Sequence, residues 1–300
     1  DIHFPLDTLN ILKHKKPDWI ITSELGTRTF LSIIYTKFSS DTKLAIWATL
    51  SERTEIGRGF FRQCLRKWLI PKADLIFTNG ESGERYIQEF GFSKEKIVRI
   101  PCTIDPEQFI NVKLADDSYR FHRLLISGQL IERKGIIEFL SVFMNWAKSH
   151  SKDQWTITLI GEGPLRQAIS DFPLVDNVKI ELVGNVPYSD LSEYYAKAGA
   201  LVFPTLADEW GVVVNEAMAC GLPVLGSKYS QAVEELIING INGWKFNIDS
   251  PMEILKALDD YYISRERLAN FVSENKNKIR EISPLLIATK MASAIKKYKL

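Results

Sequence analysis

Two acidic side chains, Asp208 and Glu216, stand eight positions apart in a segment that also contains glycine and small apolar residues. The segment reads Asp-Glu-Trp-Gly-Val-Val-Val-Asn-Glu and follows the apolar run Ala200–Phe203. This order predicts a buried strand, a loop whose glycine admits a ligand to the backbone, and a helix with Glu216 in its first turn. A carboxylate can accept two hydrogen bonds from a vicinal diol such as that of a ribose, and Asp208 could bind a sugar hydroxyl similarly. The simpler alternative is that Asp208 and Glu209 cap the loop and Glu216 caps the helix.

A second segment, Ser127–Gly135, combines glycines with two adjacent cations, Arg133 and Lys134. It lies between a predicted strand and a predicted helix. Backbone N–H groups, the helix dipole and two cations together form an anion site. The alternative is a loop with solvated charges.

Two more loops contain glycine after a predicted strand. Ile160–Leu165 could line a ligand through Gly161 and Gly163, but a glycine-rich strand-to-helix turn is common, so a structural role is favoured there. Val183–Pro187 could offer backbone atoms to a planar base, and that signal is weak alone.

These loops are positioned by short apolar runs that alternate with helical patterns, which predicts parallel sheets joined by right-handed crossovers. The periodicity is lost over residues 110–120, and this places a domain boundary between residues 115 and 116. The second domain, 116–300, has the strands and helices of a complete doubly wound unit and ends in helices. The first, 1–115, shows about four strands, whereas a Rossmann-like domain typically has about six, so we expect its N-terminal part to be missing. The predicted strands are 18–22, 43–48, 74–78, 97–100, 123–127, 155–160, 178–183, 200–203, 223–226 and 243–246, and the helices before the C-terminal region are 27–37, 57–69, 82–90, 135–148, 164–170, 189–196, 215–219 and 232–237.

The composition is that of an ordinary globular protein. The 300 residues are 45% hydrophobic and 25% charged, and the net charge of +1 gives no global attraction to nucleic acid. The three cysteines are widely spaced and the four histidines show no metal-ligand spacing, so we expect no metal, no cofactor and a reducing cytoplasm.

At this point the residues resemble a family. Asp208, seven residues, Glu216 and then Ala217-Met-Ala-Cys-Gly-Leu-Pro-Val224, together with Gly128–Gly135, are similar to the donor half of glycosyltransferase family 4. Pro101–Asp105 and Phe109 are similar to the segment between the two domains of that family. The resemblance covers roughly residues 17–300. It implies a GT-B fold, with two Rossmann-like doubly wound parallel-sheet domains, the first apparently incomplete here, and transfer with retention at the anomeric carbon without a metal.

The resemblance also implies roles for single residues. Lys134 would neutralise the departing diphosphate, Asp208 would contact the donor sugar, and Glu216 would bind the ribose. Backbone groups would contact the base at Val186. The remaining donor-binding positions implied are Gly128, Gln129, Glu209, Trp210, Gly211 and Val212.

Three positions depart from the family pattern. Asp208 stands where the family usually has glutamate, which shortens the carboxylate by one methylene. Gln129 stands where an arginine is usual, and Arg133 is a candidate to replace that cation. Glu24 follows the first strand, where a catalytic-side histidine is common.

Residues 57–69 form a separate feature, in which Arg58, Arg62 and Arg66 recur every four residues beside Phe61 and neighbouring apolar residues. A basic, aromatic helix can rest on an anionic membrane or bind a phosphorylated lipid acceptor. The alternative is a helix packed on its own domain with a solvated basic rim.

The sequence therefore favours a hexosyl-type glycosyltransferase that moves a sugar from a nucleoside-diphosphate sugar to a saccharide or lipid-linked acceptor. We expect it in the cytoplasm, at the inner face of the membrane if the residues 57–69 make a peripheral contact, with polysaccharide biosynthesis as its setting. The alternatives left open are a nucleotide-sugar-binding module without transfer activity, or an inactive homologue, and another GT-B chemistry such as phosphorolysis or sugar epimerisation.

Overall fold

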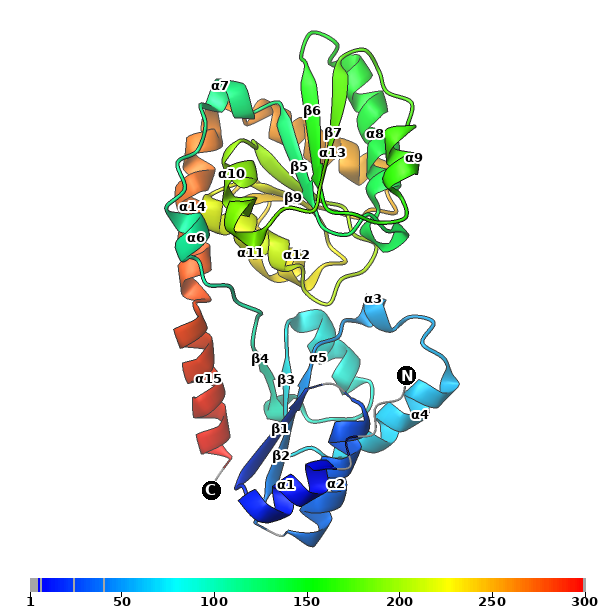
Figure 1. Cartoon of the computed structure of the whole chain (residues 1–300), viewed down its shortest axis with the longest axis vertical. Helices are drawn as coiled ribbons and strands as arrows, with labels where there is room; N and C mark the ends of the chain where they lie inside the picture. Colours follow the sequence, from blue (N-terminus) through cyan, green and yellow to red (C-terminus); the bar gives the residue numbers. More distant parts are fainter. Residues whose placement is uncertain (1–4, 6, 24, 40, 299–300) are drawn as a thin grey trace. The chain divides into compact units, whose positions relative to one another are not determined.

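The structure is a computed structural model that describes residues 5, 7–23, 25–39 and 41–298. Contacts between residues divide the chain into two compact units, residues 1–102 with 285–300, and residues 103–284. This grouping differs from the predicted boundary at 115/116 in two ways. Residues 103–115 belong with the second unit, where the Ala115 N–H donates to the Ala196 carbonyl at 2.9 Å. The last helix belongs with the first unit (Figure 1).

The first unit is built on a parallel sheet of four strands in the order β1-β2-β3-β4. β2 and β3 are almost wholly buried apolar runs, which is typical of parallel strands covered on both faces. The elements are α1 (Asp7–Lys15), β1 (Trp19–Ser23), α2 (Thr27–Phe38), β2 (Lys43–Ala48), α3 (Glu52–Glu55), α4 (Phe60–Leu69), β3 (Leu75–Thr78), α5 (Glu81–Gln88), β4 (Ile97–Arg99) and α15 (Pro284–Lys297).

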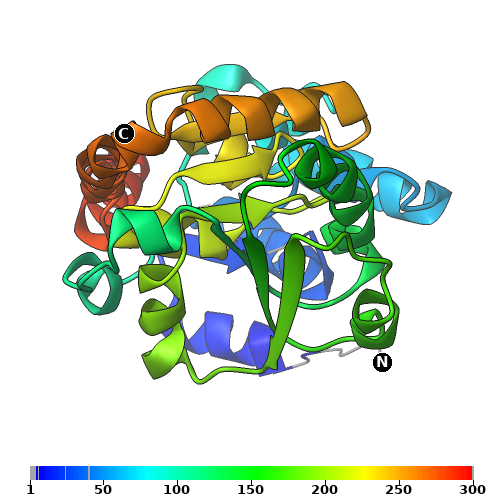
Figure 2. The same cartoon turned by 90° about the horizontal axis from the view of Figure 1, so that it is seen from above.

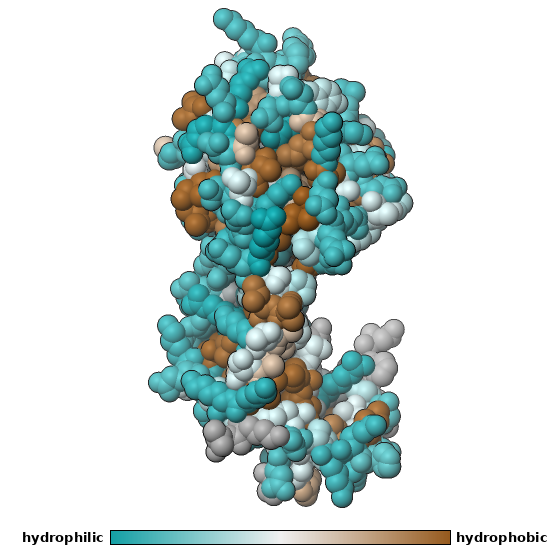
Figure 3. Space-filling model, turned by 90° about the vertical axis from the view of Figure 1, so that its left-hand side faces the viewer, coloured by the Kyte–Doolittle hydropathy of each residue, from teal (hydrophilic) through white to brown (hydrophobic). Residues whose placement is uncertain are grey.

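The C-terminal helix α15 covers part of this first sheet. Its apolar residues Ile287, Met291 and Ile295 pack against a buried cluster that includes Leu75 and Phe77 of β3. Figure 3 shows the side on which α15 lies, where separate apolar patches stand among hydrophilic side chains. These contacts are the physical reason why residues 285–300 group with the first unit.

The second unit contains six parallel strands in the order β10-β9-β8-β5-β6-β7. The order reverses between β5 and β8, as in the dinucleotide-binding arrangement of doubly wound sheets. Figure 2 shows α8 and α9 on one face of this sheet and α10 on the other. The elements are α6 (Glu107–Ile110), α7 (Asp117–Arg120), β5 (Arg123–Ser127), α8 (Ile136–Ser149), β6 (Trp155–Ile160), α9 (Arg166–Ser170), β7 (Val178–Gly184), α10 (Leu191–Ala196), β8 (Ala200–Phe203), α11 (Val212–Cys220), β9 (Val224–Ser227), α12 (Gln231–Leu236), β10 (Gly243–Phe246), α13 (Pro251–Ile263) and α14 (Leu268–Glu281).

All ten predicted strands are present, each within one residue of its predicted bounds. The helices differ more. α4 begins at Phe60 rather than at residue 57, because Gly57 and Gly59 have φ values of 74° and 72°, which no α-helical residue has. Helix α1 and the four-residue helices α3, α6 and α7 were not predicted.

Candidate active site

The loops that follow β5 and β8 meet at the middle of the second sheet. β5 pairs with both β6 and β8, and the chain continues from β5 toward β6 but from β8 toward β9. The two loops therefore diverge to opposite faces, and the crevice between such loops is where open α/β sheets bind ligands. The predicted segments Ser127–Gly135 and Asp208–Glu216 both start at this point.

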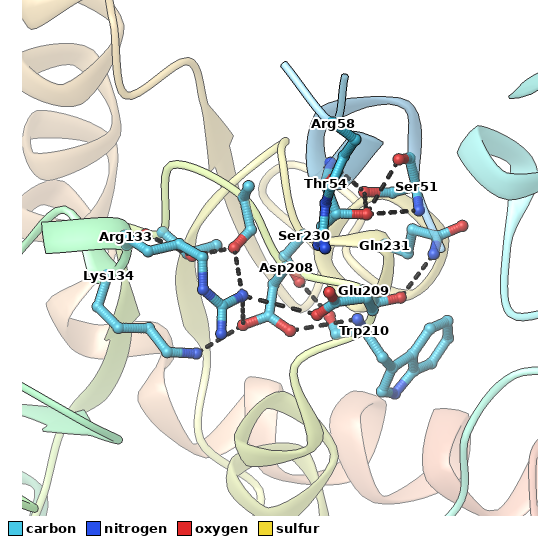
Figure 4. Close-up of polar contacts among 12 residues, drawn as sticks. Ser51, Thr54, Arg58, Arg133, Lys134, Asp208, Glu209, Trp210, Ser230 and Gln231 are labelled. Atoms are coloured by element: carbon cyan, nitrogen blue, oxygen red, sulfur yellow. Dashed lines mark hydrogen bonds and ion pairs between the residues drawn. The ribbon is translucent and has the colours of Figure 1, made fainter. Parts of the chain in front are cut away.

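The structure brings Arg133 and Lys134 to Asp208 and Glu209 (Figure 4). Lys134 Nζ donates to Asp208 Oδ2 at 2.6 Å. Arg133 Nη1 lies 3.7 Å from Asp208 Oδ2 and 3.6 Å from Glu209 Oε2, and it donates to the Ala207 carbonyl at 2.8 Å. The side chains of Lys134 and Asp208 are 16% and 11% exposed, whereas that of Arg133 is 41% exposed. The Lys134–Asp208 ion pair is thus largely shielded from solvent, and the partly exposed cation of Arg133 lies beside it.

A close backbone approach holds the two cations on the loop after β8. Gly135 has a φ of 62°, and a Cβ added there would lie 2.1 Å from the Pro204 carbonyl oxygen. The Arg133 carbonyl accepts hydrogen bonds from Leu206 N and Thr205 Oγ1 at 2.8 and 3.0 Å. Only glycine allows both this conformation and this distance. The cations were predicted at the start of α8, but they lie in a short 3₁₀ turn, Glu132–Lys134, before it.

Residues after β9 hold the loop that carries Asp208. The Asp208 N–H donates to the Tyr229 carbonyl at 3.1 Å. The side chains of Ser230 and Gln231 donate to the carbonyls of Trp210 and Glu209. Sequence reasoning missed Ser230 and Gln231. The available signal was their position shortly after the predicted strand 223–226, at the same edge of the sheet.

Helix α11 begins at Val212, three residues earlier than predicted. Gly211 precedes it with a φ of 104°, and a Cβ added there would lie 2.5 Å from the Phe203 ring. Gly211 offers no side-chain cap, so the first N–H groups of α11 and the positive end of the helix dipole are open to a ligand from the side of the preceding loop. The prediction that Glu216 lies in the first turn was wrong. Glu216 is the fifth residue of the helix and does not cap it.

Glu216 is 5% exposed and shares a hydrogen bond with a tyrosine of α10. Tyr195 Oη donates to Glu216 Oε2 at 2.8 Å, and Tyr195 is the only described residue that hydrogen-bonds this carboxylate. Burial raises the pKa of Glu216 above its usual range. Burial also raises the pKa of Tyr195, so the hydroxyl stays a donor. Nothing in the sequence singled out Tyr195.

Gly161 and Gly163 have a packing role that agrees with the structural interpretation favoured from sequence. A Cβ added at these positions would lie 2.0 Å from the Gly128 carbonyl oxygen and 2.3 Å from that of Leu130. Leu130 N also donates to the Glu162 carbonyl at 2.9 Å. The backbone of the loop after β6 thus packs closely against the backbone of the loop after β5.

The other predicted donor-binding positions lie at the same edge of the sheet with fewer contacts. Gly128 lies beside Lys134, since a Cβ added to it would be 3.8 Å from Lys134 Cε. Gln129 is exposed, and Val186 is half-buried in the loop after β7, which is separated from β8 and the Asp208 loop by β5 and β6. Glu24 lies outside the described residues.

No metal-binding cluster of three or more His, Cys, Asp or Glu side chains occurs within the part of the chain that the structure describes.

The sequence comparison finds a family and several relatives. Residues 118–278 match the family model of the glycosyl transferases group 1. The amylovoran biosynthesis glycosyltransferase AmsK of Erwinia amylovora is 34% identical over 59% of this chain and 44% of its own length. An N-acetylgalactosaminyltransferase of Campylobacter jejuni, whose name gives a diphospho-undecaprenol saccharide as acceptor, is 23% identical over 78% of this chain and 64% of its own length. The chain spans about half the length of the first curated relatives it matches.

The structural comparison shows the GT-B fold. The galactosyltransferase WaaB superposes with a TM-score of 0.76 at 15% identity, covering 97% of this chain and 78% of its own. Anabaena HepE, solved in complex with UDP, superposes with a TM-score of 0.77 at 17% identity, covering 97% of this chain and 82% of its own. The family model covers more than half of the 300 residues and includes both halves of the cluster described above. The chain therefore belongs to the group 1 glycosyl transferases.

Proposed function

We propose that the chain takes part in the transfer of a hexosyl group from a nucleoside-diphosphate sugar to a saccharide or lipid-linked acceptor, with retention at the anomeric carbon. The observation that carries the proposal is the Arg133–Lys134–Asp208 cluster at the point where the strand order reverses. The family membership supports it. So do the UDP complex of HepE and the lipid-linked acceptor in the name of the Campylobacter relative.

The diphosphate of the donor would lie between Lys134 and the start of α11. Lys134 is paired with Asp208 at 2.6 Å, which holds the ammonium group in place at the sheet edge. A bound diphosphate would share this cation and accept hydrogen bonds from the uncapped N–H groups of α11. Arg133, which reaches solvent, would supply the second cation, in the place of the arginine that Gln129 replaces.

The two carboxylates would recognise the sugars of the donor. Glu216 has one oxygen bonded to Tyr195, so its other oxygen remains to accept from the ribose diol. Asp208 would accept from a hydroxyl of the transferred sugar, and the backbone of Glu209 through Val212 would line that sugar. Val186 would present backbone groups to the base.

The chemistry needs stabilisation of charge on the leaving group. The bond between the anomeric carbon and the diphosphate oxygen breaks, and its electron pair leaves with the diphosphate. The acceptor oxygen forms a bond to the same face of the carbon, and its proton passes to the departing diphosphate. Because negative charge grows on the diphosphate, fixed cations stabilise the transition state more than the ground state.

Release of nucleoside diphosphate in the presence and absence of acceptor tests this proposal. We expect acceptor-dependent release, lowered at least about 100-fold by Lys134→Ala and about tenfold by Arg133→Ala. The control is Lys256→Ala, which removes another Lys–Asp pair, on α13, and should leave the rate unchanged. Wild-type rates in both site variants, with melting temperatures kept, would show that the diphosphate lies elsewhere.

Two further outcomes separate the alternatives. A binding module without transfer activity would show a ligand-dependent rise in melting temperature but no acceptor-dependent release. The anomeric configuration of the product, read from proton NMR coupling constants, would decide between retention and inversion.

A further inference from the structure

Most apolar side chains of helix α4 are exposed, whereas one of its charged side chains is buried. Phe60 and Phe61 are 79% and 92% exposed, and Cys64, Leu65 and Trp68 are also exposed. Arg66, in contrast, is 4% exposed. This is the reverse of the pattern of a helix that packs on its own domain.

The apolar residues form one stripe on the helix. At 3.6 residues per turn, Phe60, Cys64 and Trp68 follow one another at intervals of four, and Phe61 and Leu65 form the adjacent row. The remaining surface of the helix contains Arg62, Gln63 and Lys67. The stripe is thus continuous over the whole length of α4.

Contacts on the buried side fix the orientation of the helix. Arg66 forms an ion pair with Glu55 and donates to Tyr86 Oη at 2.8 Å. Leu69 is fully buried in the core of the first unit. Because Arg66 and Leu69 face the core, the part of the stripe around Phe60 and Phe61 faces outward. At the other end of the stripe, the Trp68 ring lies 5.5 Å from the Phe30 ring of α2 and is 38% exposed.

The charge around the stripe has a single sign. Residues 56–73 include no acidic residue, and their basic residues are Arg58, Arg62, Arg66, Lys67 and Lys72. Apart from Arg66, these are exposed. A continuous exposed apolar patch marks an interaction site, and a cationic rim selects an anionic partner. The combination matches helices that lie in the interface of an anionic bilayer.

We propose that α4 docks the first unit on an anionic lipid bilayer, with Phe60 and Phe61 inserted among the headgroups and Arg62 and Lys67 on lipid phosphates. No helix among the described residues is long and apolar enough to cross a membrane, and this docking does not require one. The proposal is independent of the donor site, because it depends only on residues of the first unit. It would bring a lipid-linked acceptor to the protein.

Co-sedimentation with vesicles tests the proposal. Vesicles of phosphatidylcholine alone are compared with vesicles that also contain phosphatidylglycerol. We expect the chain to sediment with the anionic vesicles and to be released by salt. The double variant Phe60→Ser/Phe61→Ser should bind at least about tenfold more weakly. The double variant Arg62→Glu/Lys67→Glu should lose the preference for anionic vesicles.

A matched control variant is Met252→Ser/Ile263→Ser on α13, where the replaced side chains are 80% and 78% exposed. It should bind like the wild type. Absence of wild-type binding to anionic vesicles, or equal binding by the Phe60/Phe61 variant, would overturn the proposal. So would self-association of the chain that the Phe60/Phe61 variant abolishes while no vesicle is bound.

Discussion

Glu216 holds its carboxylate almost fully out of water, with one tyrosine hydroxyl as its hydrogen-bond partner among the described residues. Burial raises its pKa, which means that the charged form is disfavoured in the folded chain. A carboxyl group whose pKa is higher in the folded chain than in the unfolded chain stabilises the fold at low pH. This stabilisation is lost as the pH rises through the pKa of the folded chain. The charged Glu216 therefore destabilises the fold at neutral pH, which is typical of a side chain kept for binding.

Glu216→Gln should weaken the binding of nucleoside diphosphate about 10- to 100-fold, because a hydrogen bond to a charged group contributes about 1.5–3 kcal/mol. Its melting temperature at neutral pH should equal or exceed that of the wild type. For the wild type, affinity should begin to fall on acidification at a pH above 4.5, the usual pKa of a glutamate, whereas the variant should not show this fall. Titration calorimetry across this range measures both effects. Unchanged affinity in the variant would remove Glu216 from the binding site.

His122 offers a separate pH prediction, for stability. It lies 4.8 Å from the Trp155 ring, and burial lowers its pKa below 6.5. The unfolded chain then binds the proton more readily, so stability is full above pH 6.5 and falls as the pH drops below it. Melting curves over roughly pH 5 to 8 should show this loss, and His122→Gln should reduce it. An equal loss in the variant would assign the pH dependence to other groups.

At the scale of elements, the turn at Gly135 positions the cations. Gly135→Ala should lower stability by more than about 2 kcal/mol, because the added Cβ would meet the Pro204 carbonyl oxygen at 2.1 Å as well as strain the backbone. Gly240→Ala is the matched control, since Gly240 also has a positive φ, 75°, but open space around it. Denaturant titration gives the loss in free energy of unfolding of each variant relative to the wild type. The difference between these two losses measures the effect of the clash with Pro204. A smaller cost at Gly135 than at Gly240 would contradict the described packing.

The strands and the meeting of the two main loops could be predicted from the sequence, whereas the helix boundaries at the site could not. Apolar runs such as Ala200–Phe203 determine a strand locally, and the carboxyl ends of parallel strands must share one edge of the sheet. This is why Lys134 and Asp208 were expected near each other. The start of α11 depends instead on Gly211 against the Phe203 ring, which is a tertiary contact. Tyr195 reaches the site only through the packing of α10, so no local pattern indicated it. Gln231 had one signal, its place shortly after a predicted strand at the same edge of the sheet.

At the scale of the whole molecule, the chain combines two parallel-sheet units of the GT-B fold. The sequence predicted C-terminal helices but assigned them all to the second domain. The amphipathic pattern of a helix does not indicate which unit the helix packs on. The position of α15 is determined by apolar contacts to β3, more than 200 residues earlier in the chain. The donor site lies within the second unit, and the candidate bilayer contact lies within the first.

We expect a nucleoside diphosphate to bind at the β5 and β8 edge of the second unit through Lys134 and Glu216. A thermal-shift panel of nucleoside diphosphates and nucleotide-sugars, run on the wild type, Lys134→Ala, Glu216→Gln and the control Lys256→Ala, tests it most directly. At least one diphosphate should raise the melting temperature of the wild type and the control, and should raise it much less in the two site variants. A panel in which no compound shifts the wild type, or in which all four proteins shift equally, would contradict it.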